Sequence, residues 1–151
     1  MTDPRVTLAG VEFAGPAFTA SGCAAAGKEL ASFFDLTEIG GVVTKSIMMR
    51  PRSGRPTPRM VETPSGMLNS IGLQGPGIES FLANDLPWLA QRGVAAFVSI
   101  AGETVEEYAQ LARILRNEPH VKAIEVNISC PNVESRGQVF ACDVMSASSV
   151  I

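Results

Sequence analysis

The chain of 151 residues lacks several features that would place it quickly in a class of proteins. It has no run approaching the ~18 apolar residues of a membrane-spanning helix, so we expect no membrane partner. Twelve basic and 15 acidic residues leave a net charge of −3, which argues against a nucleic-acid-binding protein. No internal repeat or low-complexity tract is evident. The 46% of hydrophobic residues are enough for one core.

Cysteine and histidine are also scarce. The three cysteines are Cys23, Cys130 and Cys142. They cannot all pair within the chain, and no CxxC indicates a metal site, so we expect a reduced, cytoplasmic protein without a metal. The uncharged stretch 13–27 is weakly similar to a secretory signal, but its glycines and proline argue against one. The one histidine, His120, should lie at the surface, which weakens a Cys–His hydrolase.

Hydrophobic patterning predicts an alternation of strands and helices after an opening hairpin. The hairpin pairs residues 6–8 with 11–13 around Ala9-Gly10. Buried strands are expected at residues 17–21, 41–45, 95–100 and 123–128. Helices are expected at residues 28–38, at 78–89 with a break at Pro87, at 105–115 behind a Thr104–Glu107 capping box, and from 144. The stretch 48–77, rich in proline and glycine, is expected to be an irregular functional loop. This order predicts an α/β protein with a parallel sheet.

Polar and reactive residues cluster where the predicted strands end, which is where α/β folds build their sites. They are Ser21, Lys45, Ser46, Ser99 and the stretch 127–130. Four strand–helix units make half of a (β/α)8 barrel, which typically needs ~250 residues. A complete small doubly wound domain would also fit the length.

Cys130 is the candidate with the most chemistry, because a thiolate after a buried strand can act as a base or nucleophile. The plain alternative is a buried structural cysteine. The amides of Asn127 and Asn132 flank it and suit a ligand with alternating N–H and C=O groups. Lys45 could stabilise negative charge on a ligand, or extend its ammonium into water. The stretch 69–73 is by itself an ordinary turn.

Five stretches in this order carry a resemblance to a known family. They are Thr-Ala-Ser-Gly at 19–22, Thr-Lys-Ser at 44–46, Pro-Arg-x-Gly-x-Pro-x-Pro-Arg at 51–59, Glu-Thr-Pro-x-Gly-Met-Leu-Asn-Ser-Ile-Gly-Leu at 62–73 and Glu-Val-Asn-Ile-Ser-Cys-Pro-Asn-Val at 125–133. Together they resemble the dihydroorotate dehydrogenases, FMN enzymes of de novo pyrimidine (UMP) biosynthesis. A cysteine at position 130 resembles the class 1 enzymes of this family, in which the catalytic base is cysteine rather than serine. Stretches 62–73 and 137–140 resemble the sequences of subclass 1B.

The resemblance implies a (β/α)8 TIM barrel, with residues 1–151 covering the N-terminal half of one FMN-binding domain. It implies oxidation of dihydroorotate to orotate, with Cys130 as general base at C5 and hydride transfer from C6 to FMN. The implied substrate-binding residues are Lys45, Asn69, Ser70, Ile71, Gly72, Leu73, Asn127 and Asn132. The implied FMN-binding residues are Ser21, Lys45, Ser46, Ser99 and Asn127. Ser99 departs from the family, which commonly has asparagine there.

Family members are roughly twice this length, as a full barrel requires. The resemblance implies that the other half supplies the phosphate site for FMN. It also implies a homodimer, with a heterotetramer as the larger assembly, in which a partner subunit carries FAD and a 2Fe-2S cluster. NAD and fumarate both stay open as electron acceptor. Two other functions also stay open: a non-catalytic half-barrel that associates through open sheet edges, and an FMN-dependent dihydropyrimidine dehydrogenase.

Overall fold

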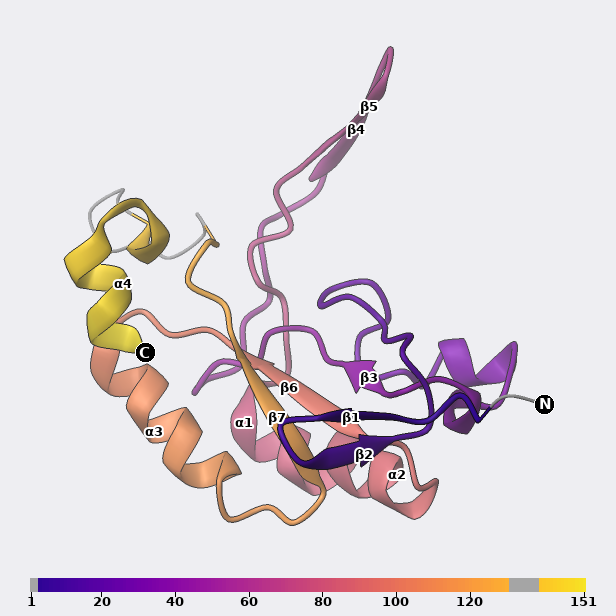
Figure 1. Ribbon diagram of the computed structural model, residues 1–151. Helices are drawn as coiled ribbons and strands as arrows, with labels where there is room; N and C mark the ends of the chain where they lie inside the picture. Colours follow the sequence, from indigo (N-terminus) through magenta and orange to yellow (C-terminus); the bar gives the residue numbers. More distant parts are fainter. Residues whose placement is uncertain (1–2, 131–138) are drawn as a thin grey trace.

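A three-stranded parallel sheet forms the centre of the chain, and the computed structural model describes residues 3–130 and 139–151 (Figure 1). The strands are β3 (Val42–Val43), β6 (Ala96–Ile100) and β7 (Val121–Val126), which lie side by side in chain order. All pairs are parallel. The α/β class predicted from the alternation of strands and helices is confirmed.

The predicted strand at residues 17–21 is reduced to one parallel bridge between Phe18 and Gly41. The side chain of Thr19 explains the short pairing. Its hydroxyl accepts a hydrogen bond from Val43 N at 2.9 Å and donates to Val43 O at 3.2 Å. A side chain therefore takes the place of the main-chain ladder on this edge of β3.

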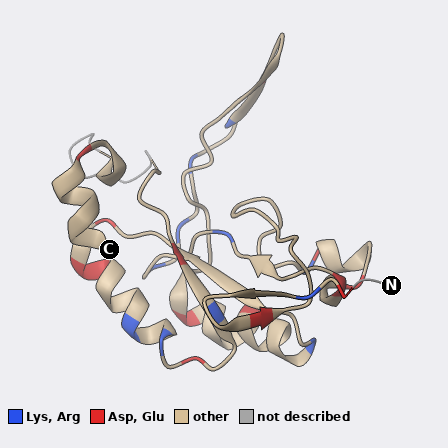
Figure 2. Cartoon of the chain, viewed as in Figure 1, with Lys and Arg blue, Asp and Glu red and all other residues tan. Residues whose placement is uncertain are grey.

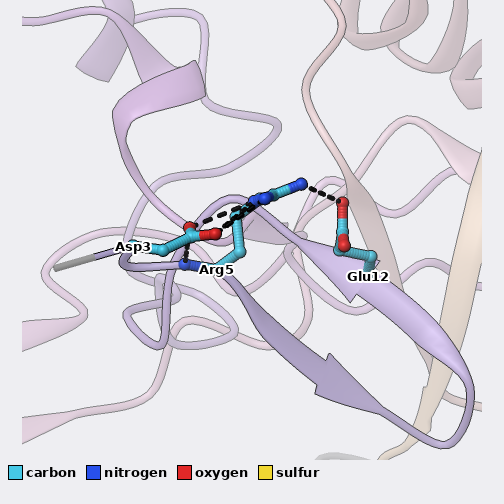
Figure 3. A network of polar contacts seen from close by, with 3 residues as sticks. All are labelled: Asp3, Arg5 and Glu12. Atoms are coloured by element: carbon cyan, nitrogen blue, oxygen red, sulfur yellow. Dashed lines mark hydrogen bonds and ion pairs between the residues drawn. The ribbon is translucent and has the colours of Figure 1, made fainter.

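The opening hairpin forms where the sequence predicts it, with β1 at Val6–Leu8 and β2 at Val11–Phe13. Ala9 and Gly10 in the turn have φ of 49° and 81°, as the two central residues of a type I′ turn require. Arg5 binds Asp3 at 2.7 Å and Glu12 at 3.2 Å beside the hairpin (Figure 3). These ion pairs are exposed and contribute little to stability.

Residues 28–38 do not form the single helix that the apolar spacing predicts. They form two 3-10 turns, η1 (Leu30–Ser32) and η2 (Leu36–Glu38). Asp35 has an extended backbone, and its carboxylate accepts hydrogen bonds from Thr37 N and Oγ1, both at 2.9 Å. Because a short polar side chain competes with the helical backbone for its hydrogen bonds, the helix stops and a new turn begins there.

Residues 77–91 form one helical rod with a break in its pattern of hydrogen bonds. It consists of α1 (Gly77–Ser80), the π-helical turn η3 (Phe81–Asp85) and α2 (Leu86–Gln91). Pro87 lies in the first turn of α2, where its missing N–H is tolerated. The predicted break at Pro87 is therefore present as a change of helix type.

Helix α3 (Val105–Leu115) begins at the predicted capping box. Thr104 Oγ1 accepts from Glu107 N at 3.3 Å, while Glu107 Oε2 accepts from Glu103 N at 2.7 Å. Helix α4 (Val144–Val150) follows the 3-10 turn η4 (Phe140–Cys142), and Asp143 caps it by accepting from Ser146 N at 2.7 Å.

The largest difference from the sequence prediction lies in stretch 48–77. Instead of an irregular loop alone, it contains a hairpin of β4 (Met60–Thr63) and β5 (Gly66–Asn69) that projects away from the rest of the chain (Figure 1). Basic residues are spaced along the segment that leads to it (Figure 2). Two of them are held in place: Arg52 pairs with Glu103 at 2.7 Å, and Arg59 binds Gln74 at 2.7 Å.

The main hydrophobic core lies between the sheet and the helices. Its fully buried side chains include Val42, Phe81, Leu89, Val98, Leu111 and Leu115. Within the described residues, no helix has both the length and the apolar character needed to cross a membrane.

Candidate functional site

Three of the predicted polar residues at strand ends meet in a buried hydrogen-bonded chain. The hydroxyls of Ser46 and Ser99 lie 2.9 Å apart, and Asn127 Nδ2 donates to Ser46 Oγ at 2.9 Å. Ser46 and Ser99 are 1% and 0% exposed. The chain therefore joins the ends of β6 and β7 to the segment that follows β3.

The other groups of Asn127 are also bound. Its Oδ1 accepts from the backbone N–H of Ser129 at 3.3 Å, and its main-chain oxygen accepts from Tyr108 Oη at 2.7 Å. Tyr108 lies within the helix predicted at residues 105–115 and is not among the predicted site residues. The signal that could have found it is a hydroxyl among the leucines on the inward face of that helix, because a buried phenol usually finds a hydrogen-bond partner.

The surroundings of Tyr108 change its ionisation. Burial raises the pKa of the phenol above its ordinary value, a hydrogen bond from the Gly102 backbone opposes the shift, and Cys130 and Glu107 add to it. The phenol and the Cys130 side chain are therefore electrostatic neighbours.

An open cavity of about 620 Å³ brings six of the predicted residues together. They are Lys45, Asn69, Ile71, Gly72, Leu73 and Cys130, joined by Gly22, Met60 and Met67. Asn69, Met60 and Met67 share one face of the β4–β5 hairpin, since Met60 lies opposite Asn69 and Met67 opposite Glu62. The hairpin thus forms one wall, and the strand ends form the floor. The volume is within the usual range for a small-molecule site.

Lys45 supplies the positive charge of the cavity. Its backbone N–H donates to Ala25 O at 2.9 Å, and its side chain is half-buried. A Cβ added to Gly22 would stand 3.5 Å from Lys45 Nζ, so the side chain passes close to this glycine. No ion pair joins Lys45 to another described residue.

Stretch 71–73 is held in a strained conformation that only some residues tolerate. Gly72 and Leu73 have φ of 83° and 53°. A Cβ on Gly72 would lie 2.9 Å from Arg55 N, which itself donates to Ile71 O at 3.0 Å. Leu73 is buried with Met48 and Ala101, and Cys130 packs against this cluster. The cysteine and the turn therefore line the same cavity.

Other predicted site residues lie outside the cavity. Ser21 is half-buried but does not line it, and Ser70 is exposed and lines a neighbouring cavity with Asn69 and Met60. Ser46, Ser99 and Asn127 form the buried chain described above and are also absent from the lining. Asn132 lies outside the described residues. His120 is exposed, as predicted, and lines a different cavity with Glu12 and Lys122.

The cavity combines one cation, one thiol and amide groups with apolar walls. Lys45 can stabilise an anion, Asn69 can pair with N–H and C=O groups, and the methionines and leucine can cover a flat ring. Among the described residues, no group of His, Cys, Asp and Glu could hold a metal ion.

Comparisons with known proteins agree with one another. Residues 4–148 match the family model described as dihydroorotate dehydrogenase. The chain is 51% identical over 149 residues to a protein of Pelobacter propionicus named dihydroorotate dehydrogenase B (NAD+), catalytic subunit, covering 99% of this chain and 49% of that protein. A protein of Anoxybacillus flavithermus with the same name is 49% identical over 135 residues, covering 89% of this chain and 43% of that protein.

A solved structure supports the fold. A crystal structure of DHODH from Eimeria tenella in complex with ferulenol superposes with a TM-score of 0.65 at 20% identity, covering 88% of this chain and 38% of that one. The likeness identifies the parallel sheet and its helices as part of a barrel. The chain spans about half the length of the curated relatives it matches.

Proposed function

Because this chain belongs to the dihydroorotate dehydrogenase family, and within it to subclass 1B, we propose that residues 1–151 are the N-terminal half of one FMN-binding (β/α)8 barrel domain. The reaction that we propose for the whole protein is the oxidation of dihydroorotate to orotate in de novo pyrimidine biosynthesis. One observation carries the proposal: the cavity unites Lys45, Asn69 and Cys130, which are 85 positions apart at the extremes (130 − 45).

Cys130 is the general base in this proposal. Its thiolate takes the proton from C5 of dihydroorotate, while the hydride leaves C6 and the C5=C6 double bond forms. General base catalysis is typically worth ~10²–10⁴-fold in rate. The packing of Cys130 against the cluster of Met48, Leu73 and Ala101 supports this role, because Cys130 and Leu73 line the same cavity.

Lys45 and the amides bind and orient in this proposal. Lys45 stabilises negative charge on the substrate and cofactor. The substrate contacts come from Asn69, Ser70, Ile71, Gly72 and Leu73, with Asn127 and Asn132 on the polar edges of the pyrimidine. Orotate suits such a set, because it has a carboxylate and a ring of alternating N–H and C=O groups.

The residues present also suit FMN. The side chains that would hold it are Ser21, Lys45, Ser46, Ser99 and Asn127. When bound, FMN supplies the acceptor for the hydride. Lys45 offers a donor to a polar ring edge, and the methionine wall offers an apolar surface. Asn127 and Ser46 lie in the buried chain, where the amide of Asn127 donates to Ser46. Ser99 reaches a ligand only through Ser46, because its own hydroxyl is buried against that residue.

The names of the relatives describe them as catalytic subunits, which supports a partner subunit for this protein as well. We propose a homodimer that joins a second subunit carrying FAD and a 2Fe-2S cluster, and that passes electrons to NAD.

The test is the visible spectrum of the purified protein after incubation with FMN and removal of the unbound flavin, before and after anaerobic dihydroorotate. We expect a yellow protein that bleaches, and a Cys130→Ala variant that stays yellow but bleaches at least a hundredfold more slowly. Dihydrouracil, which has no carboxylate, should bleach it far less. Equal bleaching by both would favour a dihydropyrimidine dehydrogenase. A protein that stays colourless even when the remaining half of the barrel is supplied would overturn the proposal.

A further inference from the structure

The phenol of Tyr108 reaches from α3 to the end of β7. Its hydroxyl donates to the main-chain oxygen of Asn127 at 2.7 Å. The residue is 2% exposed, and its ring meets Phe140 edge-on with centroids 5.7 Å apart. One hydroxyl therefore ties α3 to the residue that follows β7.

Asn127 is consequently held from two sides. Its side-chain amide is bound to Ser46, and its main chain is bound to Tyr108. The β7 ladder ends at Val126. Beyond it, Asn127 N–H donates to Ile100 O at 2.9 Å, and the phenol of Tyr108 is the side-chain contact that holds the Asn127 carbonyl on the way to Cys130. If the hydroxyl were absent, the Asn127 oxygen would lose a buried partner, which favours movement of this segment toward water.

We propose that Tyr108 is a positioning residue that fixes the segment between Asn127 and Cys130, so that Cys130 packs against the cluster of Met48, Leu73 and Ala101 and lines the cavity. The meaning of this position for catalysis rests on the function proposed above. The position itself does not, since it concerns only groups of this chain. Tyr108 touches neither the cavity nor a ligand, and acts through Asn127 and Cys130.

The test compares the reactivity of the Cys130 thiol in the unaltered protein and in Tyr108→Phe. This variant keeps the ring against Phe140 and removes only the hydroxyl. The purified protein is treated with iodoacetamide, and alkylation of each cysteine is followed by mass spectrometry of its peptide. Cys23 is exposed and serves as the internal reference. We expect the rate at Cys130 to rise at least threefold relative to Cys23, because its half-buried side chain becomes more accessible.

The matched control is Thr19→Val, which also removes a hydroxyl that bonds the backbone, but on the opposite side of β3. It should leave the Cys130 rate unchanged. The proposal is overturned if the Cys130 rate does not change in Tyr108→Phe, or if it rises equally in Thr19→Val, since the effect would then be general loosening.

A second measurement keeps the hydroxyl in place and can be made even if Tyr108→Phe fails to fold. It tests whether the phenol of Tyr108 and the thiol of Cys130 are neighbours, as the proposal requires. Tyr108 is the sole tyrosine, so the absorbance of its phenolate reports on this residue alone. Removing the thiol in Cys130→Ala should lower the pKa of Tyr108, because the neighbouring sulfur raises it. An unchanged phenol titration would show that the two groups are not neighbours. Neither measurement needs flavin. A protein that gives these responses but stays colourless with the remaining half of the barrel supplied would therefore refute the proposed function and retain the positioning role.

Discussion

The hydroxyl oxygens of Ser46 and Ser99 lie 2.9 Å apart, although the residues are 53 positions apart in the chain. Ser46 also accepts from the amide of Asn127, so its own proton is available for Ser99. The pair completes the buried chain of hydrogen bonds from Asn127 through Ser46 to Ser99. Loss of one side chain removes a hydrogen-bond partner of the next.

Ser99→Ala should lower the free energy of unfolding by about 1–3 kcal/mol, because it leaves the buried Ser46 hydroxyl short of a partner. Urea denaturation followed by circular dichroism measures the change. Ser53→Ala is the control, since Ser53 is exposed and its hydroxyl makes only a 3.5 Å contact. Equal stability of the two variants would contradict the buried chain.

Gly72→Ala should disturb the cavity more than Gly10→Ala does. Both glycines have positive φ, 83° and 81°, so both variants carry the same backbone strain of ~1–2 kcal/mol. Only at Gly72 would the new Cβ meet backbone, 2.9 Å from Arg55 N, while nothing lies within 4 Å at Gly10. Thermal unfolding and binding of orotate measure the difference. We expect orotate affinity to fall in Gly72→Ala alone.

Lys45→Met should weaken orotate binding at least tenfold, which corresponds to ~1.4 kcal/mol. The methionine keeps the packing of the stem and removes the charge in the cavity. Lys122→Met, on the exposed side of β7, removes the same charge far from the cavity and should bind normally. Isothermal titration with orotate compares the two, and equal loss in both would mean that only net charge matters.

The stability of the protein should fall as the pH rises above the ordinary phenol value of about 10. The pKa of Tyr108 is raised in the folded chain, so the folded state holds its proton at a pH where the unfolded chain has lost it. Stability from this group is complete below the unfolded pKa and is lost as the pH rises through the folded one. Denaturation at several alkaline pH values should show a shallower decline in Tyr108→Phe than in the unaltered protein.

Much of the fold could be predicted because its signals are local. The hairpin from Val6 to Phe13 depends on a two-residue turn, and α3 on the capping residue Thr104. The helix at 28–38 was wrong because apolar spacing ignores how strongly Asp35 competes for backbone hydrogen bonds. The β4–β5 hairpin was missed because its residues are exposed and have no buried face for the pattern to show.

The site was harder to predict in one respect. Position at strand ends identified Lys45 and Cys130 as candidates, the family resemblance added Asn69, and the three share a cavity. The same pattern could not separate residues that line it from those beneath it, such as Ser99, because both kinds are small and polar. Tyr108 was hidden for the opposite reason: a phenol at an inward helical position has the spacing of an ordinary core residue.

The parallel strands lie in the order in which they occur along the chain, from Phe18 through β3 and β6 to β7. During synthesis, each parallel strand can therefore pair with the parallel strand that precedes it in the chain. Among these strands, none must be inserted between two that are already paired. Such nearest-neighbour growth keeps the sequence separation of contacts low for a parallel sheet, which favours fast folding. A growing chain can thus assemble this sheet strand by strand, from β3 through β6 to β7.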